Sequence, residues 1–116
     1  MTGDAVIRLV VVDDHELFRE CLKEKLERTG SFRVVGEAAE ARGAYDVVGS
    51  TLCDVVLLDL GLPGASGATV LRELVRRHPK LRILVLTTHG EVDFVADALT
   101  AGPPATRSSI RRQTRS

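Results

Sequence analysis

Short apolar runs alternate with amphipathic segments along this chain, and that alternation limits its fold more than any other feature. Three runs are rich in Val, Leu and Ile, too short for helices and long enough for buried strands. They are residues 6–12, 54–60 and 81–86. A fourth, more exposed strand is expected at residues 32–37. Segments with helical spacing of apolar residues lie between and after these strands, at residues 16–29, 41–50, 68–78 and 91–101.

Strand and helix alternate four times, which favours a parallel sheet covered by helices on both faces. Right-handed crossovers between the strands would make it a doubly wound α/β fold. With 116 residues, 44% of them hydrophobic, the chain suits one compact domain. It has no apolar run near the ~20 residues of a membrane span and no leader-like start, so we expect a cytoplasmic location. Cys21 and Cys53 are expected to be buried free thiols.

Three carboxylate side chains and one hydroxyl lie where the predicted strands end. Asp13 and Asp14 follow the first strand, Asp59 lies near the end of the third, and Thr87 ends the fourth. In a doubly wound parallel sheet all these ends lie along one edge, where ligands bind. Crowded carboxylates repel one another unless a cation joins them, and hard oxygen ligands favour Mg²⁺. Beside Mg²⁺, a carboxylate could act as nucleophile toward a phosphoryl group.

Three motifs, VVVDDHELF, DVVLLDLGLPGASG and ILVLTTH, resemble the receiver domain of bacterial two-component response regulators. The histidine after the acidic pair and the TTH after the fourth strand resemble more specifically the LuxR-type (NarL-like) branch. The resemblance covers residues 6–102. It implies a flavodoxin-like sheet with strand order 2-1-3-4-5. Within the second motif, Pro63 and Gly67 would shape the loop that follows Asp59.

The resemblance also implies a role for each residue of the site. Asp59 would be the phosphoacceptor, Asp14 a direct Mg²⁺ ligand, and Asp13 a ligand through water. The backbone carbonyl of Gly61 would supply another Mg²⁺ ligand. The hydroxyl of Thr87 would turn toward the phosphoryl group.

The C-terminal tail departs from the family pattern. A receiver should continue after Gly102 with a fifth strand that carries an aromatic residue and ends in a lysine, followed by a last amphipathic helix. This chain instead reads PPATRSSIRRQTRS, with no lysine after Lys80 and no acidic residue beside its four arginines. We therefore predict a receiver domain at residues 1–102 and a disordered basic tail at residues 103–116. The fifth strand and the last helix are expected to be degenerate or missing.

Two explanations of this tail are open. One is a reading-frame slip near codon 102, because the codons for Pro-Pro-Ala-Thr, read one base out of register, permit Ala-Ala-Gly-Tyr, the expected family continuation. The other is a natural receiver with a divergent tail. The gene sequence after codon 102, read in the next frame, distinguishes the two.

The functional prediction is a phosphoacceptor in a histidine-to-aspartate phosphorelay, which takes a phosphoryl group from a sensor histidine kinase onto its own aspartate without enzymatic turnover. A second receiver is a further candidate partner.

Three alternatives to this function are an interaction module that no longer accepts phosphate, a non-functional truncated product, and weak nucleic-acid binding through the arginine tail. A helix-turn-helix output domain does not fit in the chain, so we expect no direct DNA binding. His15, His78 and His89 are expected to be surface histidines.

Overall fold

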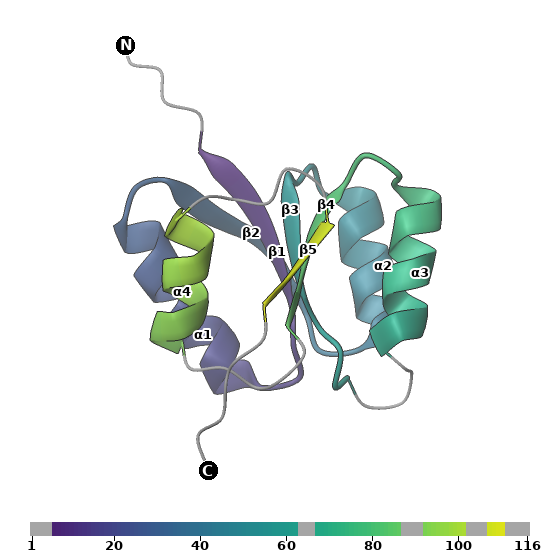
Figure 1. The fold of residues 1–116 in the computed structure, drawn as a ribbon, viewed down its shortest axis with the longest axis horizontal. Coiled ribbons are helices and arrows are strands. Elements are labelled where there is room, and N and C mark those ends of the chain that lie inside the picture. Colours follow the sequence, from purple (N-terminus) through teal and green to yellow (C-terminus); the bar gives the residue numbers. More distant parts are fainter. Residues whose placement is uncertain (1–5, 63–66, 87–91, 102–106, 111–116) are drawn as a thin grey trace.

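The computed structural model describes residues 6–62, 67–86, 92–101 and 107–110. Strands and helices alternate along these residues, close to the boundaries that the apolar pattern predicts (Figure 1). The elements are β1 (Ile7–Val12), α1 (Glu16–Arg28), β2 (Phe32–Ala38), α2 (Ala41–Ser50), β3 (Val55–Asp59), α3 (Gly67–Arg77), β4 (Arg82–Leu86), α4 (Val92–Ala101) and β5 (Arg107–Ile110). Among the described residues, no helix is long and apolar enough to cross a membrane.

The strands form one parallel sheet in the order β2-β1-β3-β4-β5. This order confirms the flavodoxin-like fold that the resemblance implied. Strands β1 and β3 are neighbours at its centre, with Val12 paired to Leu58 near their carboxyl ends. Residues that follow β1 and end β3 are therefore brought together at one edge of the sheet.

A fifth strand is present, which corrects one expectation about the tail. Its four residues, Arg107–Ile110, pair in parallel with Ile83–Leu86 of β4. The tail is therefore not disordered throughout, although this strand carries neither the lysine nor the aromatic residue of the family pattern. The backbone explains the pairing, because the outer edge of β4 offers N–H and C=O groups that an extended segment can bond whatever its side chains. A helix after β5 would begin at residues 111–116, outside the described residues.

The core lies on both faces of the sheet. Along β1, Leu9 and Val11 point to one face and Val10 and Val12 to the other, and all four are fully buried. This alternation is the reason a central parallel strand reads as a continuous apolar run. Helices α1 and α4 cover the first face, and α2 and α3 cover the second (Figure 1).

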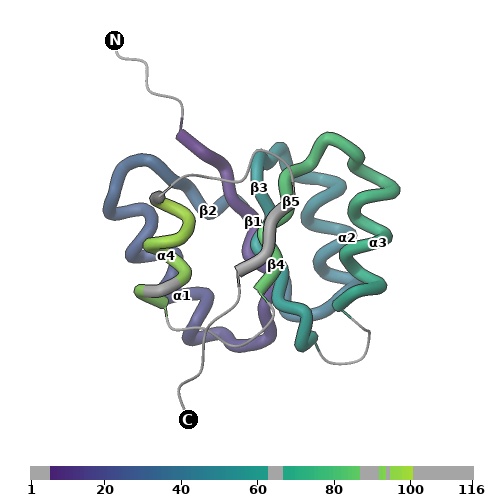
Figure 2. Tube along the Cα trace, in the orientation of Figure 1, coloured from purple at the N-terminus to yellow at the C-terminus, as the bar shows by residue number. Residues whose placement is uncertain are grey.

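Helix α4 departs from the predicted winding. From β2 to β3 and from β3 to β4 the chain moves toward β5, and the connecting helices α2 and α3 lie on one face. From β4 to β5 the chain moves in the same direction, but α4 lies on the opposite face, beside α1 (Figure 2). The hand of this crossover is therefore opposite to that of the others. Our expectation that every connection is right-handed does not hold for it.

The packing of α4 gives the physical reason. On the α1 face, Leu84 and Leu86 of β4 need a cover, and Val95 and Leu99 of α4 supply it within the same buried cluster. An ion pair between Lys25 Nζ of α1 and Asp93 Oδ1 of α4, 2.7 Å apart, joins the two helices at the surface. With α4 in this place, each face of the sheet has two helices.

Two smaller expectations have different outcomes. Gly30 follows the end of α1 with φ of +80°, so it stops the helix as predicted, in a conformation that favours glycine. The two thiols are free, but Cys21 is exposed on α1 and Cys53 is half-buried, so the prediction that both are buried was wrong.

Candidate functional site

Two aspartates at the centre of the sheet edge are nearly inaccessible to solvent. Asp13 directly follows β1 and is 1% exposed, and Asp59 is the last residue of β3 and is 4% exposed. No other charged residue is buried among those that the structure describes. Removing a carboxylate from water is costly unless other groups compensate it, so a pair of buried acids indicates a functional requirement.

The backbone after β3 holds the Asp59 side chain. The N–H of Gly61 donates a hydrogen bond of 2.9 Å to Asp59 Oδ1, and a Cβ added at Gly61 would lie 3.4 Å from that oxygen. The N–H of Leu60 donates to the carbonyl oxygen of Leu86 in β4, which continues the sheet past Asp59. At Gly67, the first residue of α3, a Cβ would overlap backbone atoms of Leu60. Glycine there lets α3 begin close to the end of β3.

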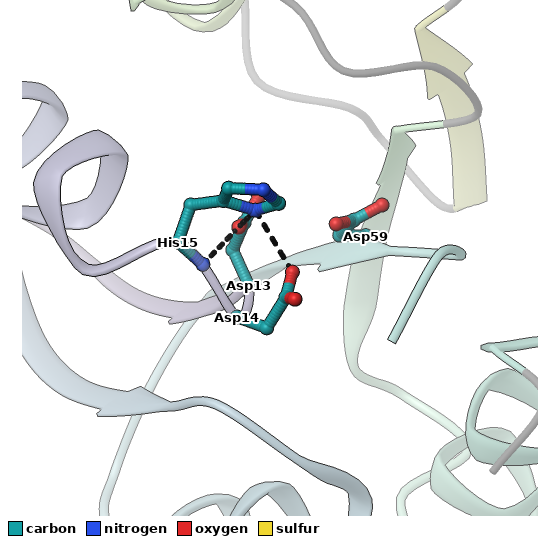
Figure 3. Close-up of side chains that lie close together, drawn as sticks. All are labelled: Asp13, Asp14, His15 and Asp59. Atoms are coloured by element: carbon teal, nitrogen blue, oxygen red, sulfur yellow. Dashed lines mark hydrogen bonds and ion pairs between the residues drawn. The ribbon is translucent and has the colours of Figure 1, made fainter. Parts of the chain in front are cut away.

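The loop between β1 and α1 brings three more polar groups to the same place. The backbone N–H of His15 donates to Asp13 Oδ1 over 2.8 Å, which closes a tight turn before α1. The His15 ring lies over the carboxylates, with Nδ1 3.1 Å from Asp13 Oδ1 and 2.9 Å from Asp14 Oδ1 (Figure 3). The predicted surface histidine is indeed exposed, but it is also part of the acidic cluster.

The surrounding charges act on the His15 ring. Its hydrogen bond to Asp13 raises the pKa of His15 above the ordinary 6.5, and the negative charges of Asp14, Asp13 and Asp59 raise it further. Desolvation opposes this rise. The imidazolium form is thus favoured because it partly balances the like charges of three carboxylates.

Arg19 is a positioning residue that the sequence did not single out. Its guanidinium Nη1 donates to the backbone carbonyl of Asp13 at 2.5 Å, and its Nε donates to Glu37 Oε1 at 3.0 Å. Arg19 thereby ties the end of β1, the first turn of α1 and the end of β2 together. In the sequence, the position of Arg19 four residues after His15 could have indicated that its side chain lies near the acidic site.

The four side chains have the donors for a divalent cation. One ligand atom from each of Asp13, Asp14, His15 and Asp59 lies within 4.8 Å of the other three. Carboxylate oxygens are the ligands that Mg²⁺ prefers, and the exposure of Asp14 leaves room for water in its shell. The donor set therefore fits the Mg²⁺ site that the sequence predicted.

The structure brings Asp13, Asp14 and Asp59 together as the sequence analysis expected, with Gly61 beside them. Thr87, Pro63 and His89 lie outside the described residues. Leu86, the residue before Thr87, is the partner of Asp59 in the β3–β4 register. His78 follows the end of α3 and does not belong to the acidic cluster.

Comparison with known proteins identifies the family. The family model of the response regulator receiver domain matches residues 9–104, and the chain belongs to this family. It is 34% identical over 83% of its length to the transcriptional regulatory protein DegU of Brevibacillus brevis. It is 40% identical over 83% of its length to the transcriptional regulatory protein NarL of Mycobacterium tuberculosis. The chain spans less than half the length of these curated relatives, 41% and 44%.

Solved structures agree with this placement. A two-component response regulator of the LuxR family from Aurantimonas sp. SI85-9A1 is 34% identical, with a TM-score of 0.72 over 92% of this chain and 74% of that one. The signal receiver domain of NarL from Mycobacterium tuberculosis is 38% identical, with a TM-score of 0.67 over 90% of this chain and 83% of that one. The chain is thus a receiver domain homologous to LuxR-type response regulators.

Proposed function

We propose that this chain accepts a phosphoryl group on Asp59 from a phosphohistidine of a sensor histidine kinase. One observation carries the proposal: the buried Asp59 carboxylate ends a central strand within 4.8 Å of ligand atoms of Asp13 and Asp14. An isolated buried carboxylate could be structural, but three at one sheet edge form the acidic site that phosphoryl transfer to aspartate requires.

The reaction follows from the groups around Asp59. A carboxylate oxygen attacks phosphorus, an O–P bond forms, and the N–P bond of the donor phosphohistidine breaks with its electron pair returning to the imidazole. The Gly61 N–H holds one oxygen of this carboxylate, Oδ1, in place. Asp13, Asp14, Asp59 and the Gly61 carbonyl would hold Mg²⁺, with Asp13 acting through water. The bound ion would neutralise charge on the phosphoryl oxygens. Thr87 would donate its hydroxyl to one of those oxygens.

The wider assignment rests on the family. The receiver domain would comprise residues 1–102, followed by a basic tail at residues 103–116. The relatives are named as transcriptional regulatory proteins, and this chain would be the receiver part of such a regulator, acting in the cytoplasm. Asp59 would be modified once per cycle, so the chain is an acceptor and not an enzyme with turnover. DNA contacts would belong to an output domain and not to these residues.

The test of the function uses the purified chain with acetyl phosphate, which needs no knowledge of the cognate kinase. We expect one added phosphoryl group in the presence of Mg²⁺ and none when the metal is chelated. Borohydride reduction of the acyl phosphate followed by mass spectrometry should map the group to Asp59. A stable product on another residue, or no product in Mg²⁺, would contradict the proposal and favour an interaction module that does not accept phosphate.

We further propose that phosphorylation switches this chain poorly. No lysine follows Lys80, so the cation that offsets phosphoryl charge in the resembled family has no counterpart in β5. The phosphoryl group adds about −1.5 to −2 charge beside three carboxylates. We expect slow labelling and little dimerisation on addition of beryllofluoride, measured by light scattering. Clean conversion from monomer to dimer would contradict this expectation.

A further inference from the structure

The backbone of His15, and not its ring, forms the start of α1. It is the residue before α1, with an extended conformation at φ −98° and ψ 105°, and its side chain makes no capping hydrogen bond. Its N–H is bonded to Asp13 Oδ1 at 2.8 Å. The imidazole is therefore not needed to start the helix, and it contacts the carboxylates of Asp13 and Asp14.

The spacing of the ring nitrogen matches that of ligands around a metal. Two ligands about 2.1 Å from an octahedral ion are about 3 Å apart when adjacent and about 4.2 Å apart when opposite. His15 Nδ1 lies 2.9 Å from Asp14 Oδ1 and 3.1 Å from Asp13 Oδ1, as an ion pair and a hydrogen bond, and these separations also equal those of adjacent ligands. An ion that takes the place of the Nδ1 proton would therefore find the ring nitrogen and two carboxylate oxygens already at ligand spacing. All four candidate ligand atoms lie within 4.8 Å of one another, so a small contraction would bring them around one ion (Figure 3).

We propose that His15 Nδ1 is a further ligand of this cation site, and that it biases the site toward divalent ions that accept nitrogen, such as Ni²⁺ and Co²⁺. The inference rests on the Mg²⁺ site of the proposed function. Mg²⁺ is a hard ion that binds oxygen and gains little from an imidazole, whereas Ni²⁺ and Co²⁺ bind imidazole well. The His15 side chain is 55% exposed, so it can move aside when Mg²⁺ binds through the carboxylates alone.

The chain offers matched controls, since His78 and His89 are its other histidines. His78 follows α3 and lies outside the cluster, so His78→Asn removes an imidazole without touching the site. His89→Asn removes the remaining one. Asparagine at position 15 is itself a strong N-cap residue, so His15→Asn preserves the start of α1.

The experiment is calorimetric titration of the full chain and these three variants with MgCl2 and with NiCl2, all at one pH and in one buffer. We expect His15→Asn to weaken Ni²⁺ binding by about 10- to 100-fold, the range found for residues that support a metal site. Mg²⁺ affinity should change less than about twofold. The other two variants should bind both ions as the unmodified chain does. Co²⁺ absorption should lose intensity in His15→Asn alone.

Each contrary result would overturn a different part of the proposal. Unchanged Ni²⁺ affinity in His15→Asn, or a loss that appears instead in His89→Asn, overturns the ligand assignment. Equal weakening of Mg²⁺ and Ni²⁺ overturns the bias between ions. Absence of Mg²⁺ binding to the unmodified chain contradicts the metal site of the proposed function, whereas normal Mg²⁺ binding with unchanged Ni²⁺ affinity overturns the histidine proposal only.

Discussion

The two ends of the central strands β1 and β3 have opposite electrostatics. At their amino ends, Asp54 accepts the backbone N–H of Arg8 at 2.8 Å and two longer hydrogen bonds from the Arg8 guanidinium, both 3.4 Å. The N–H of Asp54 in turn donates to the Arg8 carbonyl at 2.8 Å. At their carboxyl ends, Asp13, Asp14 and Asp59 gather like charges, partly balanced by His15.

This difference indicates that the amino ends of the two strands serve stability and their carboxyl ends serve function. The amino end pairs opposite charges, which is how a fold stabilises a join between neighbouring strands. The carboxyl end concentrates carboxylates that repel one another, and a fold selected for stability alone would not keep them there. The same two strands thus carry a structural join at one end and a candidate acceptor site at the other.

The largest expected effect is on phosphorylation. Asp59→Asn should abolish all Mg²⁺-dependent labelling by acetyl phosphate, because the amide keeps the shape of the side chain but is not a nucleophile. Asp54→Asn, the matched change at the amino end, should keep labelling at the level of the unmodified chain. The phosphate that hydroxylamine releases from each labelled variant measures both, because hydroxylamine cleaves an acyl phosphate. Labelling that survives in Asp59→Asn, or is lost in Asp54→Asn, would remove the functional distinction between the two ends.

Magnesium should stabilise the chain through the carboxyl end only. A ligand that binds the native state alone raises stability by about 2.7 kcal/mol when its free concentration is a hundred times Kd. Thermal unfolding with and without MgCl2 should show this gain in the unmodified chain and in Asp54→Asn. The gain should be smaller in Asp14→Ala. If Mg²⁺ shifts the midpoint of none of the three, or of all three equally, the metal site has been placed wrongly.

Substitutions at the two ends should change the metal-free stability in opposite directions. Asp54→Ala removes a charged acceptor from the Arg8 N–H, and because the side chain is partly exposed the loss should be about 1 kcal/mol. Asp59→Asn relieves repulsion between carboxylates and should raise stability by about 1 to 4 kcal/mol, the range for unit charges about 4 Å apart between the screening of water and an effective dielectric near 20. Urea unfolding in EDTA measures both. The same sign for the two variants would contradict the comparison.

The smallest expected effect is a pH dependence of the amino end. The backbone N–H of Arg8 lowers the pKa of Asp54 below its ordinary 3.8, and the guanidinium charge adds to this against desolvation. A depressed folded pKa gives stability that is present above pH 3.8 and is lost as the pH falls through the folded value. The stability difference between the unmodified chain and Asp54→Asn should therefore be constant from pH 5 to 7 and shrink below pH 3.8. A constant difference down to pH 2.5 would show that Asp54 is not responsible.

Much of the fold could be predicted from the sequence because its signals are local. A run such as residues 54–60 is mostly apolar on both faces, and its short length and β-branched residues favour a buried strand. The positions of Asp13, Asp14 and Asp59 at strand ends then follow from the sheet, since parallel strands present their carboxyl ends at one edge. Most element boundaries and the acidic cluster were thus determined by the sequence pattern, whereas the strand order came from the resemblance of its motifs to receiver domains.

Other features were decided only by the tertiary structure, because they depend on competition between surfaces far apart in the chain. The amphipathic pattern of α4 does not say which face of the sheet it covers; the need to bury Leu84 and Leu86 beside α1 decides it. The pairing of β5 with β4 was not predicted, because the backbone groups at the edge of β4 are not visible in a sequence pattern. The contacts of Arg19 with the Asp13 carbonyl and with Glu37 arise only after β1, α1 and β2 have packed, since these hydrogen bonds require distances that no sequence pattern fixes.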